Sequence, residues 1–171
     1  VERIMISFNL IGNLGRIANQ MFQYASLKGI AKNRGYEFCI PPEQVFGQKD
    51  PLVKEDVFNI YRIFNLDKKN TVQVCENPVL MENTHEFDEN LFNNCPDNVD
   101  LFGYYQSPKY FQHIQNEIRD DFTFSKEVQN SCKEVFDEVV DCEDPISLHI
   151  RRTDYLVNPN HPVQPLEYYK E

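Results

Sequence analysis

The chain has 171 residues, with 17 lysines and arginines against 27 aspartates and glutamates, so its net charge is −10. This length suits about one domain with a complete core, and the acidic balance disfavours nonspecific nucleic-acid binding and attraction to an anionic membrane surface. The 13 Phe and 9 Tyr residues are typical of a packed globular domain rather than a disordered one.

Two features of the chain bear on its compartment. No run approaches the ~20 apolar residues of a membrane helix, and residues 1–6 lack the three regions of a signal peptide, so we expect a cytoplasmic protein. The cysteines are odd in number and widely spaced, which argues against a zinc site and a disulfide framework and favours buried free thiols. They are Cys39, Cys75, Cys95, Cys132 and Cys142.

The first forty residues predict a strand, a glycine-bearing loop, a helix and a second strand. Residues 4–8 are apolar enough for a buried strand, and residues 19–33 place apolar side chains at helical spacing. Gly35 is a plausible stop for this helix, and residues 36–40 read as the next strand. This order favours a parallel sheet and an α/β fold.

The loop between strand and helix holds Gly12 and Gly15. Such a loop exposes backbone N–H groups at a helix start, where the helix dipole favours an anion. The loop matches neither the Walker A pattern nor Gly-x-Gly-x-x-Gly. An ordinary strand-to-helix turn is the alternative interpretation.

The middle of the chain predicts fewer elements. We expect an irregular connection, a short helix, a strand and a polar, poorly periodic loop at residues 41–54, 56–63, 72–75 and 77–97, respectively. His85 lies in this last loop, where a solvated side chain is expected. Four acidic residues are interpreted as a solvated face: Asp88, Glu89, Asp97 and Asp100.

The second half predicts a strand at residues 99–105 and helices at residues 108–120 and 126–140. Ser107 is a suitable N-cap and Pro108 a suitable first residue for the first of these helices. Tyr110, Phe111, Ile114 and Ile118 are expected to face inward. The second helix carries an apolar face of Val128, Cys132, Val135, Phe136 and Val139.

A short buried strand is predicted at residues 145–148, and it leads into the most distinctive stretch of the chain. This strand delivers His149, Arg151, Arg152 and Asp154 into a loop rich in Pro and Asn. Ligands of open α/β sheets bind outside the carboxyl ends of strands, and paired guanidinium groups bind phosphate or carboxylate. The alternative is a surface pair of arginines that neutralises nearby acids.

The last residues predict a stiff loop and then the start of a helix. Pro162 and Pro165 stiffen the loop, and Leu166–Tyr169 reads as a first helical turn at the end of the sequence. Because a domain rarely ends at such a turn, we expect the chain to be truncated.

Four segments, in this order, resemble motifs of the α-1,2-fucosyltransferase family, glycosyltransferase family 11. They are Gly15-Arg16-Ile17-Ala18-Asn19-Gln20-Met21-Phe22-Gln23-Tyr24-Ala25, Gly103-Tyr104-Tyr105-Gln106-Ser107-Pro108-Lys109-Tyr110-Phe111, His149-Ile150-Arg151-Arg152-Thr153-Asp154-Tyr155 and Leu166-Glu167-Tyr168-Tyr169. The third is similar to the His-x-Arg-Arg-x-Asp motif that several fucosyltransferase families share. Together the four span nearly the whole chain.

The resemblance implies an α/β fold with a Rossmann-like parallel sheet, as the N-terminal half of a GT-B-type glycosyltransferase. Residues 1–171 would form the N-terminal domain and run into the start of the donor-site region, while the C-terminal domain would be absent. The family transfers L-fucose from GDP-β-L-fucose to the 2-hydroxyl of a galactoside, with inversion and without a metal or other cofactor. We expect the chain by itself to be inactive.

The resemblance also assigns roles to particular residues. Arg151 would contact the β-phosphate as a catalytic residue, and Asp154 is a second catalytic candidate. The predicted GDP-fucose-binding residues are His149, Arg151, Arg152, Asn19, Gly15 and Arg16. Ala18 and Thr153 stand where the family commonly has Gly. Ala18 would strain its turn if that position needs positive φ, and Thr153 puts the close backbone approach of its loop in doubt.

Some alternatives remain open at this point. Asp154 could be the general base, but an ion pair with an arginine is an equal alternative and would lower its pKa. The chain could be a non-catalytic nucleotide-sugar or glycan-binding fragment, or belong to a transferase with another GDP-sugar donor. The acceptor glycan is not readable from the residues.

Overall fold

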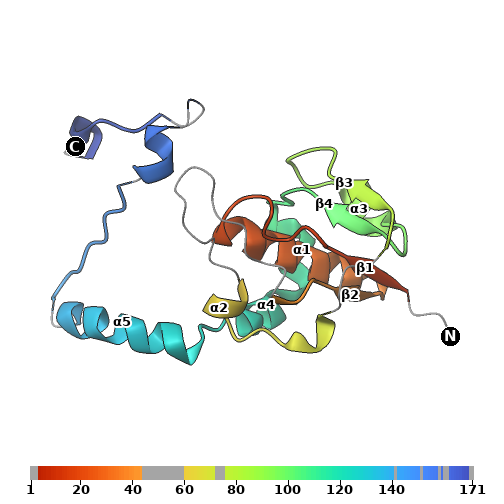
Figure 1. Ribbon diagram of the computed structural model, residues 1–171, viewed down its shortest axis with the longest axis horizontal. Helices are drawn as coiled ribbons and strands as arrows, with labels where there is room; N and C mark the ends of the chain where they lie inside the picture. Colours follow the sequence, from red (N-terminus) through yellow and green to blue (C-terminus); the bar gives the residue numbers. More distant parts are fainter. Residues whose placement is uncertain are drawn as a thin grey trace.

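The computed structural model describes residues 4–43, 60–71, 76–140, 142–150, 152–157, 159 and 162–169, without the side chains of Lys68, Thr153 and Asp154. Its centre is a four-stranded parallel sheet in the order β2-β1-β4-β3 (Figure 1). The strands are β1 (Met5–Ser7), β2 (Glu37–Cys39), β3 (Val79–Met81) and β4 (Asp100–Phe102). This Rossmann-like arrangement confirms the predicted α/β class.

Five α-helices and several 3-10 turns accompany the sheet in the described residues. The helices are α1 (Ile17–Arg34), α2 (Ile60–Ile63), α3 (Glu89–Asn94), α4 (Gln115–Asp121) and α5 (Lys126–Val139). The 3-10 turns are η2 (Lys68–Asn70), η3 (Pro108–Tyr110), η4 (Gln112–Ile114), η5 (Thr153–Leu156) and η6 (Leu166–Tyr169). No described helix combines the length and the apolar character that a membrane crossing requires.

Helix α1 packs along the sheet and supplies much of the core. Its predicted stop is confirmed, because Gly35 has φ 71° and donates its N–H to the carbonyls of Ala31 and Lys32. Leu27 and Ile30 of α1 and Leu101 of β4 are completely buried. Each such side chain contributes ~1.5–3 kcal/mol on transfer from water.

Two elements lie where the sequence predicted a polar loop. Strand β3 was missed because it has three residues, of which Val79 and Met81 are exposed, so it shows no apolar alternation. Helix α3 was missed because none of its residues is buried, although Asp88 caps it by accepting from the N–H of Leu91 at 2.8 Å.

The predicted solvated acidic face is therefore confirmed only in part. Glu89 and Asp97 are exposed as predicted, whereas Asp88 is a helix cap. Asp100 is only 4% exposed and lies within β4. Its carboxylate stays in the interior because other groups donate hydrogen bonds to it.

The helix predicted at residues 108–120 is divided into η3, η4 and α4. The break falls at Phe111, whose φ of −131° lies outside the helical range. Ser107 makes no capping bond with its side chain. The predicted inward face is nevertheless confirmed for Tyr110, Ile114 and Ile118, which are all buried.

The buried strand predicted at residues 145–148 is wrong for this structure. The segment is extended but belongs to no strand, and Ile146 is 93% exposed. An apolar run becomes a buried strand only when another strand pairs with it and a core covers it, and no described part of this chain does either. The predicted strand at 72–75 lies outside the described residues.

Helix α5 forms within one residue of its predicted range, but its apolar face is uncovered. None of its residues is buried, and Val135 and Phe136 are each about 60% exposed. The described cysteines follow the same division, and Cys75 lies outside the described residues. Cys39 and Cys95 are buried free thiols, as predicted, and burial raises the pKa of Cys95 to about 11, whereas Cys132 and Cys142 are exposed.

Two glycines, Gly29 within α1 and Gly35 at its C-terminal cap, are needed for different physical reasons. A Cβ at Gly29 would lie 2.0 Å from the carbonyl oxygen of Tyr110, whereas a Cβ at Gly35 would meet nothing within 4 Å but would carry a φ of +71°. We expect Gly29→Ala to lower the free energy of unfolding by ~3 kcal/mol through the steric clash. We expect Gly35→Ala to lower it by ~1 kcal/mol through the left-handed backbone.

Urea unfolding of the two variants beside the unchanged chain measures both effects. Equal losses would contradict the close approach of α1 to η3.

Candidate functional site

The loops that follow the parallel strands collect at one edge of the sheet. Residues 9–16 follow β1, Glu82 follows β3 and residues 103–107 follow β4. Strands β1 and β4 are neighbours in the sheet, so their loops are adjacent. In open α/β sheets this carboxyl edge is where ligands bind.

Gln23 of α1 connects the loop after β1 to the turn after β4. Its Nε2 donates to the carbonyl oxygens of Leu14 at 3.2 Å and Gly103 at 3.0 Å. Its Oε1 accepts from the N–H of Gly12 at 3.4 Å. The side chain is completely buried, so these bonds are the ones that satisfy it inside the protein.

The glycine loop leaves no room for a side chain at Gly15. Its φ is +77°, and an added Cβ would lie 1.8 Å from Nδ2 of Asn19. Asn19 also accepts a hydrogen bond from Nε2 of Gln106, across from the loop. Glycine is therefore required here by both conformation and space.

Ala18 stands where the family commonly has Gly, but the structure shows no backbone strain at this position. It lies in the first turn of α1, and the described non-glycine residues with positive φ are Asn98 and Tyr105. Ala18 therefore needs no positive φ, and an alanine fits this position without backbone strain.

The turn after β4 is held in a strained conformation. Tyr105 has a φ of 51°, which costs a non-glycine residue ~1–2 kcal/mol. The Glu82 carboxylate accepts from the N–H groups of Tyr104 at 2.7 Å and Tyr105 at 2.9 Å. Ser26 of α1 donates to the Tyr105 carbonyl at 3.0 Å. Strain that is held in this way is characteristic of ligand-binding regions.

A buried carboxylate anchors the start of the loop after β1. Asp100 of β4 accepts from the hydroxyl of Ser7 at 2.9 Å and from the N–H of Asn9 at 2.7 Å. The first of these bonds joins the two central strands, and the second fixes the point where the chain leaves β1. The start of this loop at the carboxyl edge is thus held by hydrogen bonds within the protein itself.

The predicted site residues fall into two groups that the described structure does not join. Gly15, Arg16 and Asn19 lie at the carboxyl edge. His149 and Arg152 are exposed on the segment after α5. In Figure 1 this segment lies apart from the α/β body.

Two of the predicted site residues cannot be placed in this way. Arg151 lies outside the described residues, and so does the side chain of Asp154. The roles assigned to both groups therefore stay predictions. Among the described residues, no group of three or more metal-binding side chains occurs.

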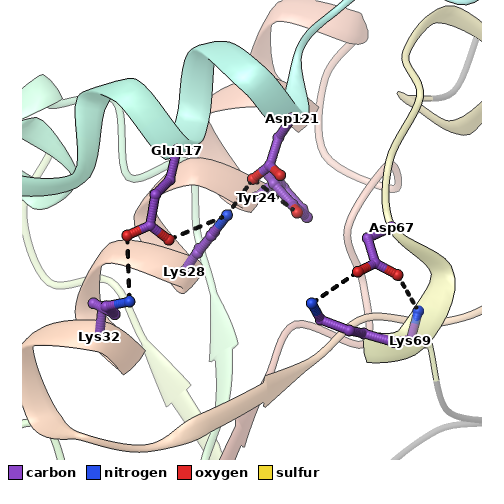
Figure 2. A network of polar contacts seen from close by, with 7 residues as sticks. All are labelled: Tyr24, Lys28, Lys32, Asp67, Lys69, Glu117 and Asp121. Atoms are coloured by element: carbon purple, nitrogen blue, oxygen red, sulfur yellow. Dashed lines mark hydrogen bonds and ion pairs between the residues drawn. The ribbon is translucent and has the colours of Figure 1, made fainter.

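A polar cavity of about 530 Å³ lies beside α1, away from the glycine loop. Figure 2 shows Glu117 and Asp121 of α4 pointing toward lysines of α1, with the Asp67–Lys69 pair across the cavity. The Nζ of Lys28 lies 2.5 Å from Asp121 and 3.7 Å from Glu117.

Six of the charged side chains around this cavity pair with one another. The ammonium group of Lys32 lies 3.2 Å from Glu117, and that of Lys69 lies 2.8 Å from Asp67. Hydrogen bonding from the partner lysine lowers the pKa of both carboxylates. Because the ion pairs of Lys28 and Lys32 with Glu117 and Asp121 join α1 to α4, we interpret this cluster as a link between the two helices rather than as an anion site.

Sequence reasoning missed the residues that build the site from within, namely Gln20, Gln23, Glu82 and Asp100. A signal existed in α1, because Gln20 and Gln23 interrupt the apolar face at helical spacing. Both are buried, and Gln20 accepts from the N–H of Ile60 at 3.1 Å. Glu82 and Asp100 carried no such signal.

Comparison with known proteins finds one family over most of the chain. Residues 3–164 match the family described as Glycosyl transferase family 11. The chain is 28% identical to a galactoside alpha-(1,2)-fucosyltransferase 2 of Sus scrofa over 88% of its own length and 43% of the relative. It is 26% identical to an alpha-1,2-colitosyltransferase of Escherichia coli over 84% of its own length and 54% of the relative.

A third relative matches over a shorter stretch. It is the O-antigen biosynthesis glycosyltransferase WbnK of Escherichia coli, with 33% identity over 47% of this chain and 30% of the relative. The chain thus spans about half or less of the curated relatives it matches. No solved structure matches it significantly.

The connection through Gln23 predicts a specific loss of stability. We expect Gln23→Met, which keeps the shape of the side chain, to lower the free energy of unfolding by about 2–3 kcal/mol, because three hydrogen bonds to backbone groups disappear. Gln129→Met is the matched control, since Gln129 is exposed and its amide bonds one carbonyl, that of Phe124. Urea unfolding measures both, and equal effects would contradict the role of Gln23.

We expect the buried hydroxyl of Tyr24 to make the stability of the fold sensitive to high pH. Burial, and then the charge of Asp121, raises its pKa above the ordinary value of 10.0, and its hydroxyl donates to Asp121 at 3.2 Å. The unfolded chain loses this proton first, so the contribution to stability is complete below about pH 10 and declines above it by ~1.4 kcal/mol per pH unit.

The check is urea unfolding between pH 8 and pH 11. We expect Tyr24→Phe to begin less stable at pH 8, where the bond to Asp121 is lost, and to fall less steeply above pH 10. Parallel curves for the two proteins would contradict the raised pKa.

Proposed function

The chain belongs to glycosyl transferase family 11, and on that basis we propose that it forms part of an enzyme that transfers L-fucose from GDP-β-L-fucose to the 2-hydroxyl of a galactoside. Several relatives bear the name galactoside alpha-(1,2)-fucosyltransferase 2. Identities of 26–28% leave the donor and the acceptor as parts of the proposal. Because the chain spans only part of these relatives, the whole activity is likewise proposed.

The observation that carries this proposal is the place of the first family motif in the structure. Gly15, Asn19 and Gln23 all belong to that motif, and all three shape the loop at the carboxyl edge. The second motif supplies the turn after β4, which Gln23 and Ser26 hold against α1. Two motifs that are far apart in sequence thus meet where an α/β sheet binds ligands.

The chemistry requires positive and hydrogen-bonding groups at the diphosphate. Cleavage of the fucose–phosphate bond leaves negative charge on GDP, which fixed cations and N–H groups can stabilise without a metal. We assign Arg151 to the β-phosphate and Arg152 and His149 to the donor and its loop. The N–H groups around Gly15 and Arg16, beside Asn19, would line the opposite wall.

The proposed reaction inverts the anomeric centre, so a base must receive the proton of the acceptor hydroxyl. Asp154 is one candidate for this role. An ion pair with a neighbouring arginine would lower its pKa and weaken it as a base. In that case Asp154 would instead hold the arginine loop in position.

A second donor has a specific observation in its favour. One relative is named an alpha-1,2-colitosyltransferase, so the sugar carried by GDP could differ from fucose while the 1,2 linkage is kept. Competition between GDP-fucose, GDP-mannose and GDP-colitose for the chain would separate these donors. If the chain is instead a fragment that binds nucleotide sugars without turnover, it would still bind a GDP-sugar in this competition.

The test of the donor assignment is calorimetric titration of GDP-fucose into the 171-residue chain. We expect Arg151→Ala to weaken binding at least tenfold, about 1.4 kcal/mol, since a charge-assisted contact to phosphate is lost. Arg119→Ala is the matched control, because Arg119 is an exposed arginine of α4. In a protein of the relatives' length, the same change should reduce kcat by ~10²–10³-fold.

Equal binding by Arg151→Ala and Arg119→Ala would remove Arg151 from the donor site. Absence of GDP-fucose binding, both in the chain and in a protein of the relatives' length, would end the fucosyltransferase proposal.

A further inference from the structure

Four side chains at the carboxyl edge are left unassigned by the donor proposal or only partly used by it. Tyr104 and Gln106 flank the strained residue after β4, His85 lies on the loop after β3, and Asn19 lies in the first turn of α1. They offer an aromatic ring, an imidazole and two amides. No lysine or arginine stands among these four.

The backbone that carries these groups is fixed on both sides of Tyr105. The ring of Tyr105 is completely buried and packs edge-on against Phe8 and Tyr110. Its N–H is held by Glu82 and its carbonyl by Ser26. Because residue 105 is anchored inward, its two neighbours are presented at the edge, with Tyr104 half-buried and Gln106 exposed.

Each of the four side chains has a neighbour within the group. The ring of His85 lies 6.3 Å from that of Tyr104, centroid to centroid. The amide of Gln106 donates to Asn19. Asn19 in turn lies against Gly15, so the Gln106–Asn19 bond marks the boundary between the glycine loop and this group.

The chemistry of the group suits a neutral sugar better than a phosphate. Amides donate and accept hydrogen bonds, as sugar hydroxyls do, and an aromatic face can cover the apolar C–H face of a pyranose. The Glu82 carboxylate lies directly behind the turn, bonded to the N–H of Tyr104. Its negative charge would repel a diphosphate placed here.

We propose that the acceptor galactoside binds at a site, here called the sugar seat, that is formed by Tyr104, Gln106, Asn19 and His85. The sugar ring lies against Tyr104, and the sugar hydroxyls lie at the two amides. This inference rests on the proposed function, and it names the acceptor side of that site. The nucleotide then lies on the Gly15–Arg16 side, and the acceptor lies on the side of β3 and β4.

The test is saturation-transfer NMR of lactose with the 171-residue chain, because this method detects millimolar binding. We expect transfer to the galactose protons in the unchanged chain and in Tyr104→Phe, which keeps the ring. Tyr104→Ala and Gln106→Met should each weaken lactose binding about tenfold, equal to about 1.4 kcal/mol. Tyr168→Ala is the control for loss of an exposed tyrosine and should change nothing.

Urea unfolding of each variant separates loss of the sugar contact from loss of the fold. Gln106 is exposed, so Gln106→Met keeps the test valid even if Tyr104→Ala fails to fold. Absence of transfer in the unchanged chain would overturn the proposal. So would equal transfer in Gln106→Met and the unchanged chain.

The donor titration keeps the two proposals distinct. Lactose binding that depends on Tyr104 and Gln106, without GDP-fucose binding to the chain or to a protein of the relatives' length, would leave the sugar seat and end the donor assignment. GDP-fucose binding with lactose binding that ignores both residues would keep the proposed function and end this inference.

Discussion

The carboxyl edge of this protein depends on one buried amide. Gln23 is bonded to the glycine loop at Leu14 and Gly12 and to the turn after β4 at Gly103, so a single side chain sets the spacing between the two loops. A buried amide without partners would be costly, and this cost is what makes the arrangement specific. Any other position of either loop leaves Gln23 unsatisfied.

Helix α1 extends this principle along its length. On the side of the sheet it carries Gln20, Gln23 and Ser26, whose bonds reach α2, the glycine loop and the turn after β4. In addition, Lys28 and Tyr24 bind Asp121 of α4 by an ion pair and a hydrogen bond, respectively (Figure 2). The helix therefore joins the sheet, the site and the outer helix, and its polar side chains decide how these parts sit.

The strained turn after β4 shows how this rigidity serves a site. Tyr105 keeps a left-handed backbone because the Glu82 carboxylate, the Ser26 hydroxyl and the packing of its own ring all hold it. The same anchors leave Tyr104 and Gln106 at the edge. A preformed sugar seat loses little conformational entropy on binding, which is the physical advantage of storing strain there.

Residue order by itself determined several local elements and the family. Periodicity and a glycine stop predicted α1, apolar runs predicted β1, β2 and β4, and four ordered motifs indicated the fucosyltransferase resemblance. Only the tertiary structure decided which polar residues are internal. Asp100, predicted to be solvated, is buried because Ser7 and Asn9 lie beside it. The run at residues 145–148 forms no strand because it has no pairing partner in the described structure. Periodicity depends on near neighbours, whereas burial and pairing depend on residues that are far away in the sequence.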